Sequence, residues 1–408
     1  MSCRSCGSLN LHLVLDLGIC PPSNAYQLTL NAGTQEKEFP LRVLICQDCW
    51  LFQTEDYLTS QELFTSNYSY LSSTSTSWVV HSNQFVEHII GNLALTSKSL
   101  VYEVASNDGY LLQFFKNYHI PICGIEPTEL AAKIALERGI RTEIEFLAYD
   151  SSEQILAKYG PGDLVIGNNV FAHVPDINDF TKALGNLLKP NGVIVLEFPH
   201  IAELLKYSQF DTIYHEHFSY FSLISAETIF KRNGLRIWKV EKLSTHGGSL
   251  RVYGCLVKAE LPEDPSVAVL REEENRSGLT SITPYLMLQD AALRIKEELL
   301  SFLASAAKEK KHVAAYGAAA KGNTLLNFCG ITSEQIKYVA DAAESKIGKF
   351  LPGSGIPIVE PSYLFSDSPD YILILPWNLS QEISEIIDLK MLTKSYKKVV
   401  AVPKLKLY

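Results

Sequence analysis

The sequence predicts an α/β protein with a cysteine-rich N-terminal domain, a central Rossmann-like domain and a C-terminal Rossmann-like domain. Three observations predict this fold. Two C-x-x-C pairs lie before residue 50. Strand-like and helix-like segments alternate from about residue 98 to residue 200, and the alternation starts again near residue 312. This pattern is typical of parallel sheets covered by helices.

Composition places the chain among ordinary globular proteins. Its 408 residues are 47% hydrophobic, which allows a large core and two to four domains at about 100 to 200 residues each. No segment approaches the ~20 apolar residues of a membrane-spanning helix, and the first residues lack the pattern of a secretory signal. We therefore expect a cytoplasmic protein without a membrane partner. The net charge of −9 argues against broad nucleic-acid binding, which needs a basic surface.

Cysteine spacing predicts a metal site in residues 1–56. Cys3 and Cys6 form one C-x-x-C pair, Cys46 and Cys49 form a second, and the other four cysteines stand alone. Two such turns supply the four thiolates of a tetrahedral zinc ion. Four protein ligands leave no position for a reacting water, so we expect a structural zinc. Reducible cysteine pairs are the alternative, which a reducing cytosol disfavours.

The first strand, turn and helix of the central region have the layout of a nucleotide site. Residues 57–96 precede it with helical periodicity. The strand SLVYEVA ends in a segment from Glu103 to Gly109 whose small residues allow a tight turn, and Glu126 closes the next strand. A carboxylate there suits two ribose hydroxyls. The spacing fits NAD or S-adenosylmethionine, although the loop lacks the G-x-G-x-x-G that cradles a pyrophosphate.

A charged segment, EDPSVAVLREEENRSG, and a long helical pattern lead to the second α/β unit. There Gly317-x-Ala319-x-x-Gly322 follows an apolar strand and precedes a helix, with Lys321 inside the loop. Backbone N–H groups and one cation could hold a diphosphate at such a place. Asp341 ends the next strand, where an acidic residue would meet a sugar hydroxyl. NAD fits this spacing too, and a helix start with unused amides is the plainer alternative.

Residues 214–217, Tyr-His-Glu-His, gather four side chains that handle protons or bind metals. In an extended segment Tyr214 and Glu216 would face one way and His215 and His217 the other, whereas in a turn all four would converge. A zinc motif H-E-x-x-H would need a histidine at position 219, which is a serine. The remaining interpretations are an acid/base centre and an accidental polar cluster.

Taken together, these segments resemble one enzyme family. The C-x-x-C pairs, EVASNDGYLL, GIEPT, NNVFAHVPD, YHEHFSYFS, THGGSLRVY and YGAAAKGNTLLNF are similar to those of S-adenosylmethionine-dependent sugar C-methyltransferases, which act on nucleotide-linked ketodeoxysugars. The resemblance covers nearly the whole chain. It implies a zinc-binding domain in residues 1–56, a methyltransferase domain with a helical lead-in and an active-site insertion in residues 57–300, and a Rossmann-like nucleotide-sugar-binding domain in residues 301–408.

The resemblance implies an activity in deoxysugar biosynthesis, the C-methylation of a dTDP-linked 4-keto-deoxysugar beside the ketone, with C-3 favoured. A C–H beside a ketone is a weak acid, so the reaction needs a base and donors that stabilise the enolate oxygen. Matched along the family motif, His217 is the favoured base, Tyr214 is the enolate partner or the alternative base, and Glu216 orients the imidazole. Further family site positions match His173, Tyr68 and Tyr70.

The resemblance also implies two sets of binding residues. The S-adenosylmethionine set lies at the ends of the first strands: Glu103, Ala105, Asn107, Asp108, Gly109, Glu126, Pro127, Asn168 and Asn169. Ala105 stands where many methyltransferases have the first loop glycine. The nucleotide-sugar set lies later in the chain: His215, Gly247, Gly248, Lys321, Gly322, Asn323 and Asp341. Of these, Lys321 and Asn323 are expected near the phosphates. A β-bulge would explain the pair Gly247 and Gly248 as well as a close approach to substrate does.

Two functions from other classes fit parts of the pattern. A zinc knuckle joined to a methyltransferase fold could methylate nucleic acid, which predicts a basic face that the charge of −9 and the lack of Lys/Arg runs disfavour. A chain that keeps the fold could instead bind nucleotide-sugars without catalysis. The expected partner is a nucleotide-sugar, with no nucleic acid, and the expected state is a monomer or a weak homo-oligomer.

Overall fold

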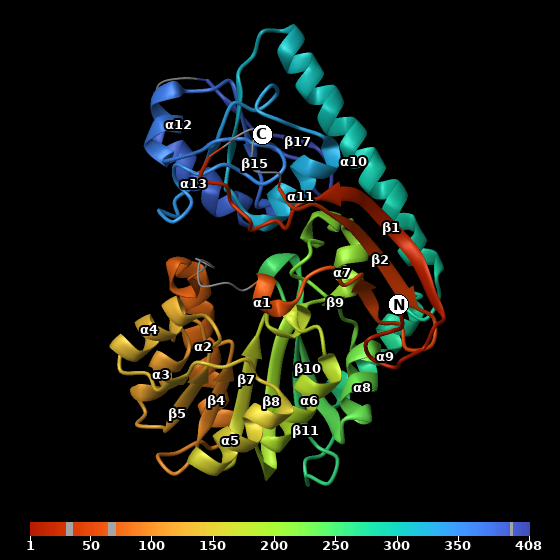
Figure 1. The fold of residues 1–408 in the computed structure, drawn as a ribbon, viewed down its shortest axis with the longest axis vertical. Helices are drawn as coiled ribbons and strands as arrows, with labels where there is room; N and C mark the ends of the chain where they lie inside the picture. The colour runs from red at the N-terminus through yellow and green to blue at the C-terminus, as the bar shows by residue number, and fades with distance from the viewer. Residues whose placement is uncertain (30–35, 64–70, 392–394) are drawn as a thin grey trace.

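The computed structural model describes residues 1–29, 36–63, 71–391 and 395–408. Two α/β units lie one above the other in Figure 1, the C-terminal unit at the top and the central unit below. The N-terminal strands and one long helix run along one side of both units. The expected α/β class with three parts is confirmed.

The central sheet is parallel in its core and antiparallel at one edge. The strands VYEV and ICGI are almost completely buried, as expected of strands covered by helices on both faces. Its strands run in the order β10-β11-β8-β7-β4-β5-β6. Their bounds are β4 Val101–Val104, β5 Ile122–Ile125, β6 Thr142–Glu143, β7 Gly162–Asn168, β8 Leu188–Pro199, β10 Leu235–Leu243 and β11 Ser249–Leu256.

Helices and short 3-10 turns surround the central sheet. Helix α6 shows why they form there, because its apolar residues recur on one face and that face is buried, while Asp176 caps its N-terminus. The α-helices are α1 Ser60–Leu63, α2 Thr76–Asn92, α3 Leu112–Lys116, α4 Glu129–Glu137, α5 Tyr149–Tyr159, α6 Ile177–Asn186, α7 Ile201–Lys206, α8 Leu223–Arg232 and α9 Pro265–Arg276. The 3-10 turns are η1 Ser72–Thr74, η2 Phe171–His173, η3 Phe210–Thr212 and η4 Thr245–Gly247.

The N-terminal sheet takes its last strand from far along the chain. Its order is β1-β2-β3-β9, and Phe52 of β3 pairs antiparallel with Tyr220 of β9. Strand β9 comes directly after the Tyr-His-Glu-His segment. The N-terminal domain is therefore joined by backbone hydrogen bonds to the segment that carries the candidate acid/base residues. The strand bounds are β1 Leu11–Cys20, β2 Phe39–Cys46, β3 Phe52–Thr54 and β9 Ser219–Tyr220.

The C-terminal unit is a second, smaller sheet in the order β14-β13-β12-β15-β16-β17. All of its pairs are parallel except β16 with β17. Its strands are β12 Val313–Tyr316, β13 Val339–Ala340, β14 Ile358–Val359, β15 Tyr371–Ile374, β16 Lys397–Val400 and β17 Lys406–Leu407. Its helical segments are α11 Ala320–Cys329, α12 Pro361–Asp367, η5 Trp377–Leu379 and α13 Ser380–Lys390.

Helix α10, Thr283–Lys308, runs through residue 300, so the boundary expected between residues 300 and 301 lies inside a helix. One apolar core joins this helix to the N-terminal sheet, the C-terminal sheet and the segment before residue 214. It includes Val43 of β2, Leu299 of α10, Leu373 of β15 and Ile213, all buried. The three parts of the chain thus share a core around the candidate site.

Candidate active site and metal centre

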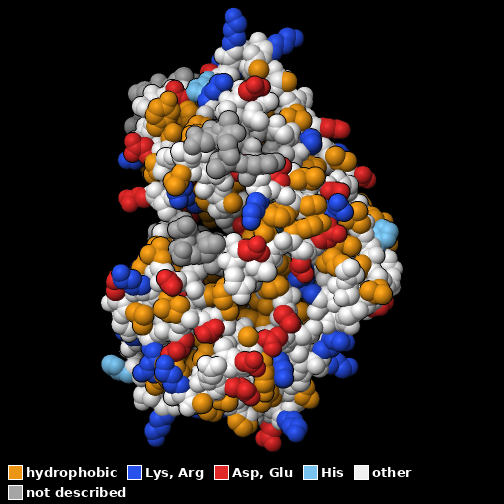
Figure 2. Space-filling view, viewed as in Figure 1, with side chains coloured by type: hydrophobic (Ala, Val, Ile, Leu, Met, Phe, Trp, Pro, Cys, Tyr) orange, Lys and Arg blue, Asp and Glu red, His pale blue; other side chains and the backbone are white. Residues whose placement is uncertain are grey.

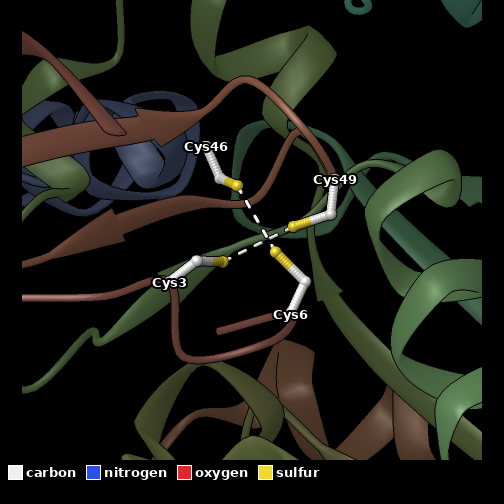
Figure 3. A group of neighbouring side chains, drawn as sticks. All are labelled: Cys3, Cys6, Cys46 and Cys49. Carbon is white, nitrogen blue, oxygen red and sulfur yellow. Dashed lines mark hydrogen bonds between the residues drawn. The ribbon is translucent and has the colours of Figure 1, made fainter. Parts of the chain in front are cut away.

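The four paired cysteines converge at the start of the N-terminal domain (Figure 3). Their sulfur atoms all lie within 4.8 Å of one another, with Cys3 to Cys49 at 3.5 Å and Cys6 to Cys46 at 3.6 Å. Tetrahedral Zn–S bonds of about 2.3 Å place neighbouring sulfur atoms about 3.8 Å apart. The cluster therefore fits one structural zinc ion with a closed ligand set.

The loop after β4 bends sharply at residues that are rarely bent this way. Ala105 and Asn107 have positive φ angles of 54° and 49°, and Gly109 has a φ of 78°. A side chain on Gly109 would collide with Ile140, so this position needs glycine for both its conformation and its space. Ala105 keeps a left-handed conformation that glycine would adopt more easily, which adds strain to the turn.

Buried acceptors without partners collect where β4 and β7 end. Neither carboxylate oxygen of Glu103 has a hydrogen-bond partner of ordinary geometry, and burial raises the pKa of this carboxyl well above its usual value. The amide of Asn168 is unpaired, and so is Oδ1 of Asn169, whose Nδ2 lies 3.1 Å from Nε2 of His246. Unpaired buried acceptors are costly, so a ligand that brings donors is expected here. The α-amino group of S-adenosylmethionine fits that requirement.

Glu126 directly follows β5 and lies beside the loop after β4. Its Oε2 accepts from the backbone N–H of Asn107 at 2.9 Å, and its Oε1 accepts from the N–H of Thr128 at 2.8 Å and from the Thr128 hydroxyl. Burial raises the pKa of Glu126. Pro127 begins the turn into α4. The carboxylate is held in one orientation, with lone pairs left for the ribose hydroxyls expected there.

The Tyr-His-Glu-His segment is a turn in which only the first and last side chains converge. The N–H of His217 donates to the Tyr214 carbonyl at 2.9 Å, and the Tyr214 hydroxyl lies 2.7 Å from Nε2 of His217. The other ring nitrogen, Nδ1, lies 3.0 Å from the carbonyl oxygen of Thr212. A carbonyl only accepts, so Nδ1 carries the proton and Nε2 accepts from the tyrosine. Neither expected arrangement of the four side chains is found.

A second imidazole lies against this pair. The rings of His173 and His217 are 4.6 Å apart, and Nδ1 of His173 donates to the Glu216 carbonyl at 2.7 Å. Burial lowers the pKa of His173 to about 4. Burial and the neighbouring His173 lower the pKa of His217 well below its usual value. Both imidazoles are therefore neutral at pH 7.

Glu216 and His215 point away from the Tyr214–His217 pair. Oε1 of Glu216 accepts from the N–H and the side-chain amide of Asn24, both at 3.2 Å, and burial raises its pKa. The expectation that this carboxylate orients the catalytic imidazole is wrong, because the Thr212 carbonyl holds His217. His215 lies against Phe39 and the Pro40 carbonyl of the N-terminal domain, so its expected substrate contact stays a prediction.

The nucleotide-type loop of the C-terminal unit is filled by contacts of its own. Asp341 accepts from the N–H of Ala318 at 2.6 Å and from the N–H of Ala343 at 2.8 Å. Lys346 lies 3.6 Å from Asp341 and donates to the Ala318 carbonyl at 2.8 Å, which also accepts from the Tyr26 hydroxyl at 2.7 Å. The strand end, loop and cation expected of an anion site are present, with Lys346 as a cation beside the loop.

Lys321 and two glycines in this unit differ from expectation. Lys321 is the second residue of α11 and lies in the helix, not inside the loop, and its ammonium donates to Asn378 at 2.7 Å. Side chains at Gly317 and Gly322 would collide with Pro376 and Leu375, respectively. These glycines allow a tight turn and close helix–strand packing. Asn323 is buried, with its amide donating to the Ser23 carbonyl at 3.4 Å.

The glycine pair after β10 makes room for protein side chains. Gly247 and Gly248 have φ angles of 90° and 118°. A side chain at Gly247 would collide with the Trp377 ring, and one at Gly248 would collide with Glu203. The close approach expected here is therefore made by Trp377 of the C-terminal unit. Tyr68 and Tyr70, the other expected site residues, lie outside the described residues.

Comparison with known proteins agrees with this geometry. The chain is 35% identical to the C-methyltransferase NovU of Streptomyces niveus over 381 residues, which is 93% of this chain and 90% of that protein. This chain belongs to the C-methyltransferase family. Three parts of it match families described as a zinc binding domain (residues 3–64), a methyltransferase domain (residues 79–240) and a C-methyltransferase C-terminal domain (residues 244–403).

Two solved structures match less than half of this C-methyltransferase, with TM-scores below 0.5. A SAM-dependent methyltransferase from Anabaena variabilis has 14% identity and a TM-score of 0.37, covering 43% of this chain and 85% of that one. Magnesium protoporphyrin IX methyltransferase from Synechocystis, solved with bound SAM, has 16% identity and a TM-score of 0.32, covering 43% of this chain and 79% of that one.

No helix in the described residues is long and apolar enough to cross a bilayer.

Family membership and the site together give the chemistry. The protein is an S-adenosylmethionine-dependent C-methyltransferase with a zinc-binding domain. The bound cofactor supplies an electrophilic methyl group, and the unpaired acceptors at the ends of β4 and β7 fit its donor groups. Transfer of that methyl group to carbon needs a carbon nucleophile on the substrate, and the Tyr214 hydroxyl and His217 Nε2, 2.7 Å apart, are groups of the kind that accept and donate protons.

Proposed function

We propose that this C-methyltransferase methylates a dTDP-linked 4-keto-deoxysugar at the carbon next to the ketone, C-3, through an enolate. The observation that carries the proposal is the pair of Tyr214 and His217. Nε2 of the neutral His217 imidazole accepts a hydrogen bond from the Tyr214 hydroxyl at 2.7 Å. This pair lies where the central unit meets the C-terminal unit. Thr324 of α11, for example, donates to the carbonyl of Ile213 at 2.9 Å.

The hydrogen bonds assign a direction to the proton. The Thr212 carbonyl keeps the proton of His217 on Nδ1, so Nε2 is the basic nitrogen and already accepts from Tyr214. Tyr214 is half-buried, whereas His217 is buried. A substrate C–H therefore meets the tyrosine oxygen first. Tyr214 takes the proton while its own hydroxyl proton passes to His217, or it moves aside and His217 takes the proton directly.

The low basicity of His217 suits a proton that has to be handed on. Its pKa lies well below its usual value, because burial and the adjacent His173 disfavour the imidazolium. A protonated His217 would return its proton readily. Because this base is weak, removal of a proton from carbon requires strong stabilisation of the negative charge on the enolate oxygen. The hydroxyl of Tyr214, once reprotonated, is one donor of the required kind.

The nucleotide end of the substrate is assigned to the C-terminal unit. The amides at the start of α11 and the ammonium of Lys346, beside Asp341, offer donors and positive charge for a diphosphate. The overall charge of −9 makes such a local site necessary for an anionic substrate. The sugar would then reach across to the Tyr214–His217 pair, with its C–H at the tyrosine oxygen.

A substrate panel tests the proposal. The enzyme would be incubated with methyl-labelled S-adenosylmethionine and 4-keto-deoxysugars linked to dTDP, UDP or GDP, with the matching 4-hydroxy sugars as controls. NMR of the product should place the label on C-3 of the dTDP-linked 4-keto sugar and leave the 4-hydroxy sugars unlabelled. Label on oxygen, or on RNA in a parallel reaction, would reject the proposal.

A further inference from the structure

Building on the proposed function, we propose that Lys321 and Trp377 of the C-terminal unit belong to the methyl-transfer site. Lys321 stabilises the enolate oxygen, and Trp377 positions the loops on either side of it. This assignment moves Lys321 away from the diphosphate, where its sequence position alone would put it. It makes the C-terminal unit a contributor to the reaction as well as to nucleotide binding.

The direction of the Lys321 side chain is the first observation. Its ammonium donates to Oδ1 of Asn378 at 2.7 Å and lies 4.7 Å from the centre of the Trp377 ring. Both partners follow β15, on the side of the unit that packs against the central unit. Asp341 and Lys346 instead lie together beside the loop before α11, where Lys346 donates to the Ala318 carbonyl.

Trp377 connects this cation to the central unit. Its Nε1–H donates to Oδ2 of Asp211 at 2.7 Å, and Asp211 lies three residues before Tyr214. The same indole packs on Gly247, where a Cβ atom would collide with it. Gln209 donates to the Gly247 carbonyl at 2.8 Å and fixes the second loop to the first. One aromatic ring thus holds both loops and supports the ammonium of Lys321.

The charges around Lys321 lie on the central-unit side. Burial lowers the pKa of Lys321 to about 8, and Asp211 is the charge that offsets part of this effect. The ammonium in turn is close enough to help lower the pKa values of His217 and His246, after burial as the main cause. Asn378 and Trp377, on its own side, carry no charge. The cation therefore lies beside the Trp377 ring that is hydrogen-bonded to Asp211, three residues before Tyr214.

Asp211 adds a second sign that the region is built for a charged intermediate. It is fully buried, its Oδ1 has no partner among the described residues, and burial raises its pKa to about 6. With a pKa of about 6 for the carboxyl and about 8 for the ammonium, both groups are mostly charged at pH 7. A cation whose charge is only partly offset by Asp211 can stabilise a new negative charge strongly, because little solvent screens the interaction.

The proposed step balances in protons and electrons. The α-proton leaves carbon for the Tyr214–His217 pair, and the C–H electron pair moves toward the ketone, leaving negative charge on its oxygen. Lys321 remains protonated and donates a hydrogen bond to that oxygen. When the carbon attacks the methyl group, the ketone is restored and the old bonding pair stays on sulfur. Lys321 neither gains nor loses a proton over the cycle.

Two lysine variants separate reaction chemistry from nucleotide binding. Lys321→Met should lower kcat about 100-fold or more, with little change in KM for the nucleotide-sugar. It should also slow exchange of the sugar α-proton with deuterated water without S-adenosylmethionine. Lys346→Met is the matched variant beside the nucleotide loop and should raise KM with kcat nearly unchanged. Lys337→Met, on the surface of the same unit, controls for loss of a lysine.

The pH profile of kcat/KM gives a readout that a purely structural role would not move. Wild-type activity should fall as pH rises through about 8, where Lys321 loses its proton. Lys321→Arg stays charged, so its alkaline limb should move to higher pH. Asp211→Asn removes the charge that supports the ammonium, so its limb should move to lower pH. Melting curves of each variant check that it is folded.

The outcomes are distinct. A variant Lys321→Met with a raised KM and an unchanged kcat would overturn the proposal in favour of a diphosphate contact. An alkaline limb that stays in place in Lys321→Arg and in Asp211→Asn would overturn it as well. If wild-type enzyme methylates no ketosugar in the panel, the proposed function fails and this inference fails with it. If wild-type enzyme is active and only Lys321→Met behaves as wild type, the failure belongs to Lys321 alone.

Discussion

The two α/β units share a topology but present opposite chemistry at matching loops. Beside the loop after β4 lie buried acceptors that have no hydrogen-bond partner of ordinary geometry among the described residues, among them both oxygens of Glu103. In the C-terminal unit Asp341, at the end of β13, accepts from two backbone amides, as Glu126 at the end of β5 does in the central unit, and Lys346 lies beside Asp341. The first loop needs donors from a ligand, whereas the second satisfies its own carboxylate and has Lys346 and the start of α11 beside it for the proposed diphosphate.

This difference indicates what each unit is prepared to bind. A cationic ligand with amino and hydroxyl donors satisfies the acceptors of the central unit, whereas an anion satisfies the amides of the C-terminal unit. A Rossmann-like turn does not by itself indicate which ligand binds beside it. The buried acceptors without ordinary partners in one unit, and the cation Lys346 in the other, carry the information. Figure 2 shows an indentation on the left edge, between the two units.

The largest expected effect comes from the zinc site, because the N-terminal domain touches both units. Cys46→Ser should lose the metal and lower the unfolding free energy by several kcal/mol, since binding of a structural zinc ion contributes on the order of 10 kcal/mol to folding. Metal content and thermal unfolding measure this. Cys255→Ser, at a buried lone cysteine, should keep the metal. A metal-free protein of full stability would contradict the assignment.

The next effect lies where the two units meet. His217→Asn should lower kcat by about 10² to 10⁴, because the base is lost while the hydrogen bond to Thr212 can be kept. Tyr214→Phe should slow turnover by a similar factor and also abolish α-proton exchange in deuterated water. Calorimetry should find both ligands still bound. Near wild-type turnover in both variants would reject the pair as the acid/base centre.

Matched amide substitutions test the opposite chemistry of the two loops directly. Glu103→Gln should weaken S-adenosylmethionine binding by about tenfold or more, because one acceptor oxygen for the amino group of the ligand is lost, and should stabilise the ligand-free protein. Asp341→Asn should instead destabilise it, because a carboxylate that accepts two amide bonds becomes a weaker acceptor. Thermal melting and calorimetry measure both. The same sign of stability change in the two variants would break the comparison.

Stability should also depend on pH in a direction set by the buried carboxyls. Burial raises the pKa of Asp211 from 3.8 to about 6, so the folded protein holds this proton more tightly than the unfolded chain. The free energy of unfolding should therefore fall as pH rises from about 4 through 6, by about 3 kcal/mol at most. Asp211→Asn should lose this part of the slope. Denaturant unfolding at pH 5 and pH 7.5 measures it.

The smallest effect concerns the strained turn after β4. Ala105→Gly removes the cost of a left-handed alanine and should stabilise the protein by about 1 kcal/mol. Binding of S-adenosylmethionine should be unchanged or slightly tighter. Thermal melting measures Ala105→Gly beside Ala94→Gly, which replaces a left-handed alanine on the surface. The difference between the two gains in stability is the part specific to the loop after β4. A destabilised Ala105→Gly would mean that the turn depends on the methyl group.

Local patterns in the sequence predicted the parts that depend on local spacing. The zinc ligands follow from two C-x-x-C turns, and the strand–turn–helix patterns at Glu103 and Gly317 have the expected positions. Helix α9 was obscured by its charge, because only Val267, Leu270 and Glu274 of it are buried. The final edge of the central sheet, β10 and β11, is antiparallel and breaks the strand–helix alternation on which the prediction rested.

Contacts between distant segments could not be read from the sequence. The Glu216 carboxylate meets Asn24, the Ala318 carbonyl meets Tyr26, and the Asp211 carboxylate meets Trp377. Each pair joins residues from different parts of the chain, and nothing in the spacing of one partner indicates the other. The segment P-P-S-N-A-Y carried one available signal, since an aromatic residue in a polar turn of a small domain often has a partner elsewhere.

The pairing of β3 with β9 has a consequence for how the chain is made. Synthesis proceeds from the N-terminus, and domains generally fold as they emerge. The four cysteines leave the ribosome before the central unit does, so zinc can bind while that unit is still being made. The sheet that they anchor keeps an open edge at Phe52–Thr54 until Ser219 and Tyr220 arrive. The nascent chain must therefore expose an unpaired strand throughout synthesis of most of the central unit, which makes this edge a natural place for a chaperone to act.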